Sequence, residues 1–159
     1  MPDKVPMSRS EMMSRIGPRD TAPEMAIRRT LHRAGYRFQL HRKDLPGRPD
    51  LTLPKHRAVI FIHGCFWHGH EGCRNFRIPK TNSAFWKEKI ARNIERDRRA
   101  LVSLKLLDWR VLVVWECATG AKRVEKTASE IASWLQEQEV AGEIPKLAPS
   151  ARLKDGGSA

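Results

Sequence analysis

Residues 58–62 read Ala-Val-Ile-Phe-Ile, and residues 110–115 read Arg-Val-Leu-Val-Val-Trp. Continuous apolar runs of this length, rich in β-branched side chains, are typical of strands buried on both faces of a sheet. The segment between them, about 83–107, predicts a long amphipathic helix, because its apolar residues recur every three or four positions. This stripe comprises Trp86, Ile90, Ile94, Leu101 and Leu104. Two adjacent parallel strands therefore form the expected centre of the fold.

Further elements surround this centre. The stretch 21–24, Thr-Ala-Pro-Glu, is a helix-capping sequence, and Gly35 marks the end of the helix that follows it. Residues 36–40 alternate as in a half-buried strand, and another strand begins at Asp50 after a Pro-Gly-Arg-Pro turn. A last amphipathic helix is expected over about 122–138. The order helix, three strands, helix, strand, helix predicts an α/β fold, a three-layer sandwich around a mixed sheet.

The domain organisation and composition limit the function. We expect a polar N-terminal arm or short helix at 1–20, one folded domain at 21–138 and a disordered tail at 139–159. The 159 residues include 30 Lys and Arg against 18 acidic residues, a formal net charge of +12. This charge favours a nucleic acid partner first and an acidic membrane second. With no membrane span and no signal peptide visible, we expect a cytoplasmic, nucleoid-associated protein.

The three cysteines favour a metal site over a disulfide framework, because they are odd in number and the expected compartment is reducing. Three thiolates and one imidazole form a normal structural zinc set. Cys65 and Cys117 each follow one of the two buried strands, so parallel pairing would bring them to one edge of the sheet. The predicted zinc ligands are Cys65, His70, Cys73 and Cys117, with His68 as an alternative to His70 and three unrelated thiols as the plainer interpretation.

Acids and histidines gather around the same strand ends. Asp50 begins a strand and His63 ends its neighbour, so a carboxylate beside a strand-end carbonyl predicts a Mg²⁺ site with an imidazole ready for proton transfer. The helical spacing turns Asp97 inward, where it either orients His68 or pairs with an arginine. Taken alone, Asp50 could be a turn residue, and the capping sequence accounts fully for Glu24.

Aromatic residues complete the pattern. Phe66 and Trp67 are consecutive in the loop after residue 62, so at least one of them should be exposed. Exposed aromatics in a basic protein can wedge between bases. Trp86 fits either this role or the core, because it begins the apolar stripe of the long helix.

Five stretches of the chain resemble the Vsr family of very-short-patch mismatch-repair endonucleases. They follow one another in order between about residues 8 and 137. They are Arg19-Asp20-Thr21-Ala22-Pro23-Glu24, Leu45-Pro46-Gly47-Arg48-Pro49-Asp50, Val59-Ile60-Phe61-Ile62-His63-Gly64-Cys65-Phe66-Trp67-His68, Phe85-Trp86 with Asn93-Ile94-Glu95-Arg96-Asp97-Arg98-Arg99, and Trp109-Arg110-Val111-Leu112-Val113-Val114-Trp115-Glu116-Cys117.

The resemblance implies a restriction-endonuclease-like fold with one structural zinc, and a Mg²⁺-dependent nick in duplex DNA 5′ to the thymine of a T:G mismatch. It implies that Asp50 and the carbonyl of Ile62 hold Mg²⁺. His68, supported by Asp97, would be the catalytic histidine. His63 and Glu24 would act through waters around the metal or on the scissile phosphate. The implied intercalating wedge is Phe66, Trp67 and Trp86, and the implied zinc ligands are Cys65, His70, Cys73 and Cys117.

Two other functions remain open from the sequence: a restriction-type endonuclease acting on matched DNA, and a non-catalytic zinc-stabilised DNA-binding module. The first usually carries an acid-x-Lys on its second catalytic strand, where this chain has Phe61-Ile62-His63. The expected partner is T:G-mismatched duplex DNA bound by a monomer. Mismatch-repair matchmaking proteins and a repair DNA polymerase stay open as further partners.

Overall fold

A five-stranded mixed sheet forms the middle of the protein. The computed structural model describes residues 21–146, in which the strands lie side by side in chain order, from β1 to β5. The first three strands are antiparallel neighbours, and β4 and β5 continue parallel to β3. Their bounds are β1 Gln39–Leu40, β2 Leu51–Leu53, β3 Ala58–His63, β4 Arg110–Trp115 and β5 Ala141–Ile144. The predicted parallel pair is confirmed, with His63 of β3 opposite Trp115 of β4.

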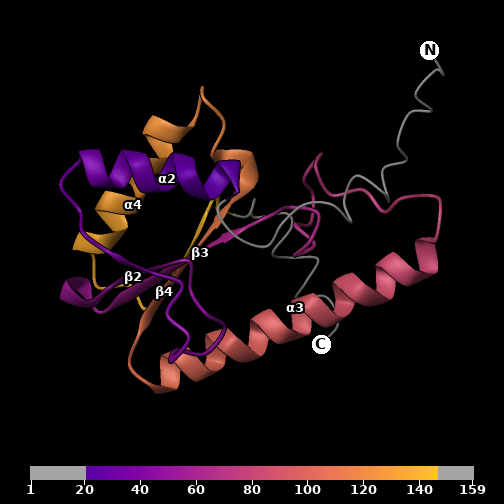
Figure 1. Ribbon diagram of the computed structural model, residues 1–159, viewed down its shortest axis with the longest axis horizontal. Coiled ribbons are helices and arrows are strands. Elements are labelled where there is room, and N and C mark those ends of the chain that lie inside the picture. The colour runs from indigo at the N-terminus through magenta and orange to yellow at the C-terminus, as the bar shows by residue number, and fades with distance from the viewer. Residues whose placement is uncertain (1–20, 147–159) are drawn as a thin grey trace, which may run out of the picture.

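Helices cover both faces of this sheet (Figure 1). Helix α3 (Ser83–Leu106) packs on one face, while α2 (Ala22–Arg33) and α4 (Val124–Gln136) pack on the other. Alternate residues of β3 separate accordingly: Val59 lies in the core with Leu104 of α3, and Ile60 lies in the core with Ile131 of α4. Two 3-10 turns, Pro54–His56 and Glu116–Ala118, complete the connections. The predicted three-layer α/β arrangement around a mixed sheet is therefore present.

The ends of α2 follow the predicted capping chemistry. The side chain of Thr21 accepts a hydrogen bond from the backbone N–H of Glu24, and Pro23 stands in the first turn. At the other end Gly35 adopts a φ of +99°, a conformation that glycine reaches without a Cβ clash. Tyr36 then donates to the carbonyl of Leu31, which closes a Schellman motif. Glu24 lies in the capped first turn of this helix, and its side chain is buried.

Three expectations need correction. The domain was expected to end at residue 138, but β5 adds an ordered edge strand at 141–144. This strand is short and shows no alternation, and it depends on Gly142, where a Cβ would lie 2.6 Å from Nε1 of Trp134. Ile94 was placed on the buried stripe of α3 but is 45% exposed. The strand predicted at 36–40 contains only Gln39 and Leu40.

The expected arm at 1–20 and the part of the expected tail at 147–159 lie outside the described residues. Among residues 21–146, no helix combines the length and the apolar character that crossing a membrane requires.

Candidate functional site

The candidate site lies where β3 and β4 end. Because the two strands are parallel and in register, the loops that follow them leave the sheet at the same edge. A hydrogen bond joins these loops, since the backbone N–H of Cys65 donates to Oε1 of Glu116 at 3.0 Å. Three groups of potential metal-binding side chains among the described residues lie in or near this region. They are Glu24 with His41 and Asp50, His63 with His68 and Asp97, and Cys65 with His70, Cys73 and Cys117.

The first group is centred on Asp50, which precedes β2. Its Oδ2 accepts a hydrogen bond from the backbone N–H of Ile62 at 2.7 Å, so β3 fixes the carboxylate. Helix α2 supplies Glu24, which is buried and paired with Arg28 at 2.8 Å. His41, at the end of β1, places its Nε2 2.9 Å from Oε1 of Glu24. Three different elements of the fold thus meet at one polar cluster.

Burial makes this cluster suited to a cation. Desolvation raises the pKa of Asp50 to about 7, and the neighbouring Glu24 carboxylate adds to the rise. The Ile62 N–H and the charge of Arg28 act in the opposite direction. Two carboxylates and an imidazole have their ligand atoms within 4.8 Å of one another. The two carboxylates of this group fit a hard divalent cation, which prefers oxygen ligands and would relieve the repulsion between the two acids.

The second group is a histidine pair held by an acid. Nδ1 of His68 lies 2.5 Å from Oδ2 of Asp97, which α3 presents toward the loop. The rings of His63 and His68 stack with centroids 3.8 Å apart and planes within 4°. Burial, followed by the charge of His68, lowers the pKa of His63 well below its ordinary value. His63 is therefore neutral, while Asp97 holds a proton on Nδ1 of His68 and leaves Nε2 available.

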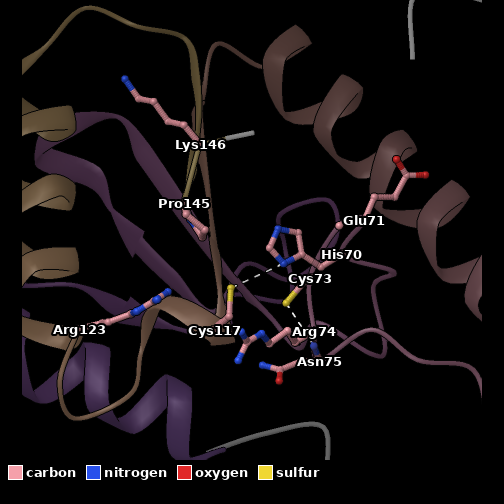
Figure 2. A pocket seen from close by; sticks show the side chains of 10 residues that line it. His70, Glu71, Cys73, Arg74, Asn75, Cys117, Arg123, Pro145 and Lys146 are labelled. Carbon is pink, nitrogen blue, oxygen red and sulfur yellow. Dashed lines mark hydrogen bonds between the residues drawn. The ribbon is translucent and has the colours of Figure 1, made fainter. Parts of the chain in front are cut away.

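The third group brings the predicted zinc ligands together. Figure 2 shows His70, Cys73 and Cys117 converging from the loop and from the end of β4. Nδ1 of His70 lies 3.5 Å from Sγ of Cys65 and 3.7 Å from Sγ of Cys117. The His70 ring stacks on Trp115 at 4.1 Å, which fixes its orientation. His70 therefore stands with the cysteines, whereas His68 stands with Asp97.

These distances suit one tetrahedral ion. With Zn–S near 2.3 Å and Zn–N near 2.05 Å, two ligand atoms of a tetrahedron are about 3.6 Å apart. Burial raises the pKa of the Cys65 and Cys117 thiols, and neighbouring cysteines add to the rise. A cation that stabilises the thiolates would reverse this effect. The donor set and its spacing fit Zn²⁺.

The proposed wedge residues form one aromatic cluster, but two of them are not exposed. Phe66 and Trp86 are 2% and 1% exposed, and they pack with Ile90. Trp67 is only partly buried, and its ring centroid lies 5.6 Å from that of Trp86. The expectation that at least one of the two loop aromatics is exposed is met only in part, because Phe66 is buried and Trp67 is half-buried. The apolar stripe of α3 accounts for Trp86, and the role of all three in DNA binding stays a prediction.

Sequence reasoning missed His41 and Arg28. Both belong to the Asp50 cluster, because Nη2 of Arg28 lies 2.8 Å from Nε2 of His41. Arg28 follows Glu24 by four residues, which is a readable helical spacing. His41 gives no such local signal. Its place opposite Asp50 depends on the pairing of β1 with β2, where Leu40 faces Leu51.

Comparisons with known proteins identify relatives of this chain. The family model described as DNA mismatch endonuclease Vsr matches residues 3–74. The DNA mismatch endonuclease Vsr of Escherichia coli is 45% identical over 136 residues, which cover 86% of this chain and 85% of that protein. The type II nicking enzyme V.XorIIP of Xanthomonas oryzae is 50% identical over 112 residues, 70% of this chain and 82% of that protein. A Neisseria meningitidis relative, the type II nicking enzyme V.NmeAIP, is 42% identical over 116 residues, 73% of this chain and 82% of that protein. The chain therefore belongs to the Vsr family of DNA endonucleases.

Proposed function

We propose that the protein is a Mg²⁺-dependent endonuclease that nicks one strand of duplex DNA 5′ to the thymine of a T:G mismatch, and so starts very-short-patch repair. The mismatch is the product of 5-methylcytosine deamination. One observation carries the proposal: a half-buried carboxylate is held by the N–H of Ile62, the residue before His63, and His63 stacks on a histidine that an acid orients. The names of the Escherichia coli and Xanthomonas relatives support the mismatch and the single-strand cut.

Asp50 and the carbonyl of Ile62 would hold the cation, with Glu24 completing the acidic side of the site. The hydrogen bond from the Ile62 N–H keeps the Asp50 carboxylate against β3, so the position of the carboxylate does not depend on the substrate. When bound, Mg²⁺ would polarise the scissile phosphate and neutralise charge that develops on it. The two carboxylates by themselves would repel DNA, which makes catalysis without the cation unfavourable.

His68 is the proposed general acid–base residue. Asp97 holds Nδ1–H of His68, so Nε2 is the nitrogen that exchanges a proton with the reacting phosphate or water. Stacked His63 stays neutral and buried, and it limits the ring of His68 to one plane. In this arrangement Asp97 and His63 are positioning residues and Nε2 of His68 does the proton transfer.

The zinc and aromatic groups would couple the site to mismatch recognition. Cys65 and Cys117 follow the two strands that carry the site, so a zinc ion between them would hold the loop rigidly to the sheet. Phe66 and Trp67 lie in that loop, with Trp86 behind them. We propose that these rings enter the DNA stack beside the mismatch. Because Phe66 and Trp86 are buried in the free protein, insertion requires the cluster to open on DNA.

A panel of duplexes tests this function. Each carries one T:G pair in a different sequence context, with a separate label on each strand, and is incubated with and without Mg²⁺. The proposal predicts one cut, on the thymine strand only, and only with Mg²⁺. Cutting of both strands of matched DNA would favour a restriction-type enzyme, and binding without any cut would favour a DNA-binding module.

A further inference from the structure

His41 is placed beside the proposed cation site by the antiparallel pairing of β1 and β2. Leu40 pairs with Leu51, so His41 is the next residue and lies opposite Asp50. Its backbone N–H donates to the carbonyl oxygen of Asp50 at 3.3 Å. His41 also adopts a φ of +46°, a left-handed conformation that only a few per cent of non-glycine residues adopt. The fold thus turns this residue away from the strand path and toward the acids.

The ring of His41 bridges two elements. Nε2 lies 2.9 Å from Oε1 of Glu24 and 2.8 Å from Nη2 of Arg28. Nδ1 faces Oδ1 of Asp50 at 3.9 Å, which is too long for a hydrogen bond. The side chain is 19% exposed, so little water competes for these contacts. Nε2 has one hydrogen-bonding site, so it either accepts from the Arg28 guanidinium or, when protonated, donates to Glu24, and His41 acts on the Glu24 carboxylate from the sheet side through Arg28 or directly.

We propose that His41 is a positioning residue of the cation site, which holds the Glu24 carboxylate over Asp50 together with Arg28. This inference rests on the proposed function, because it assumes that Asp50 and Glu24 serve a divalent cation. Glu24 has a flexible side chain, and its ion pair with Arg28, four residues later on α2, would by itself orient the carboxylate along the helix. The contact with His41 adds a second point from the sheet, so that both carboxylates face one position.

A role as a direct metal ligand through Nε2 is less suited to the geometry. Nε2 already contacts Glu24 and Arg28, and the guanidinium would repel a second cation at that nitrogen. The requirement on residue 41 is therefore a polar atom that reaches Glu24 or Arg28. A glutamine amide satisfies it, since it offers a donor and an acceptor at similar reach. An asparagine amide has the same chemistry and tolerates positive φ, but it is one methylene too short.

The difference in length between the asparagine and glutamine side chains provides a matched pair of variants, His41→Asn and His41→Gln. Mn²⁺ serves as the probe, and its binding to the protein as purified is followed by electron paramagnetic resonance. Thermal melting is recorded for each protein. His32→Asn, an exposed histidine in the last turn of α2, is the control. Asp50→Ala reports on the cation site itself.

The expected result is a Kd for Mn²⁺ about tenfold higher in His41→Asn, the range seen when groups that orient metal ligands are removed. His41→Gln should stay within about twofold of the wild type, and His32→Asn should not change. Nicking by His41→Asn should recover at saturating Mg²⁺, with an unchanged KM for DNA.

An unchanged Kd for Mn²⁺ in His41→Asn would overturn the inference. So would equal losses in both His41 variants, because the imidazole nitrogen would then be a ligand. If Asp50→Ala leaves Mn²⁺ binding intact, the proposed cation site is wrong. If Asp50→Ala abolishes Mn²⁺ binding but His41→Asn does not change it, only the positioning role of His41 is refuted.

Discussion

Replacing Asp50 with asparagine should stabilise the cation-free protein at alkaline pH, although it should abolish catalysis. The carboxylate is largely shielded from water, with 19% of its side chain exposed, and this desolvation together with the neighbouring Glu24 raises its pKa to about 7 from an ordinary value near 3.9. At about 1.4 kcal/mol per pKa unit, this difference corresponds to about 4 kcal/mol of unfolding free energy. Part of this destabilisation comes from repulsion with the Glu24 carboxylate. We therefore expect the neutral amide at residue 50 to raise the free energy of unfolding by about 2–4 kcal/mol.

The pH dependence gives the sign of the effect. Below about pH 4 the group is protonated in both folded and unfolded protein, so the acid costs nothing. Between about pH 4 and 7 the unfolded chain loses this proton while the folded protein keeps it, and the wild type loses stability. Above about pH 7 both states are ionised and the loss is complete. The advantage of Asp50→Asn should therefore be small at pH 4.5 and full at pH 8.

Urea unfolding at both pH values measures this advantage, in Mg²⁺-free buffer without chelator so that any zinc is retained. The amide oxygen can still accept from the Ile62 N–H, which keeps the native geometry. Asp108→Asn is the control, because Asp108 is exposed and asparagine tolerates its φ of +63°. The control should change by less than about 0.5 kcal/mol at either pH. An Asp50→Asn protein no more stable than the wild type at pH 8 would refute the buried-acid reasoning.

Three further outcomes follow from the site. Asp97→Asn should lower the single-turnover nicking rate by about 100-fold with little change in DNA affinity, because it weakens proton transfer by the oriented histidine; an unchanged rate would remove Asp97 from the mechanism. Cys117→Ala should reduce bound zinc, measured by atomic absorption, from about one ion per chain to almost none, with loss of both mismatch binding and nicking; a zinc-free protein that nicks normally would contradict the coupling. Gly69→Ala should lower the unfolding free energy by about 1–3 kcal/mol in urea titrations, since its φ is +63° and its Cβ would lie 3.1 Å from Cγ2 of buried Ile90, besides displacing the end of the Ile94 side chain. Gly72 has a φ of +75° and no atom within 4 Å of an added Cβ, so Gly72→Ala should lose only the unfolding free energy that backbone strain removes. Equal losses of unfolding free energy in the two variants would exclude the steric contribution at Gly69.

Local patterns were enough to predict the centre of the fold. The apolar runs at 58–62 and 110–115 identified the parallel strands, and their ends placed Cys65 and Cys117 at one edge. Helical spacing turned Asp97 inward, where it meets His68. These predictions succeeded because each depends on the periodicity of residues within one helix or strand, or on two strands being neighbours in the sheet.

What the sequence did not reveal depends on contacts between distant segments. The edge strand at 141–144 carries no alternation, and its pairing relies on a glycine that fits beneath Trp134. The role of His41 depends on the register of a two-residue strand. The burial of Phe66 and Trp86 reflects packing between the loop and α3, which neither segment shows alone.

The most direct test of the central claim compares nicking and binding of one T:G duplex by the wild type, Asp50→Ala and His68→Ala. Single-turnover cleavage is measured with Mg²⁺, and affinity is measured without it. We predict that both variants bind the mismatch with affinity close to that of the wild type and that neither cuts the thymine strand. Cleavage at the wild-type rate by either variant would contradict the assignment of catalysis to this end of the sheet.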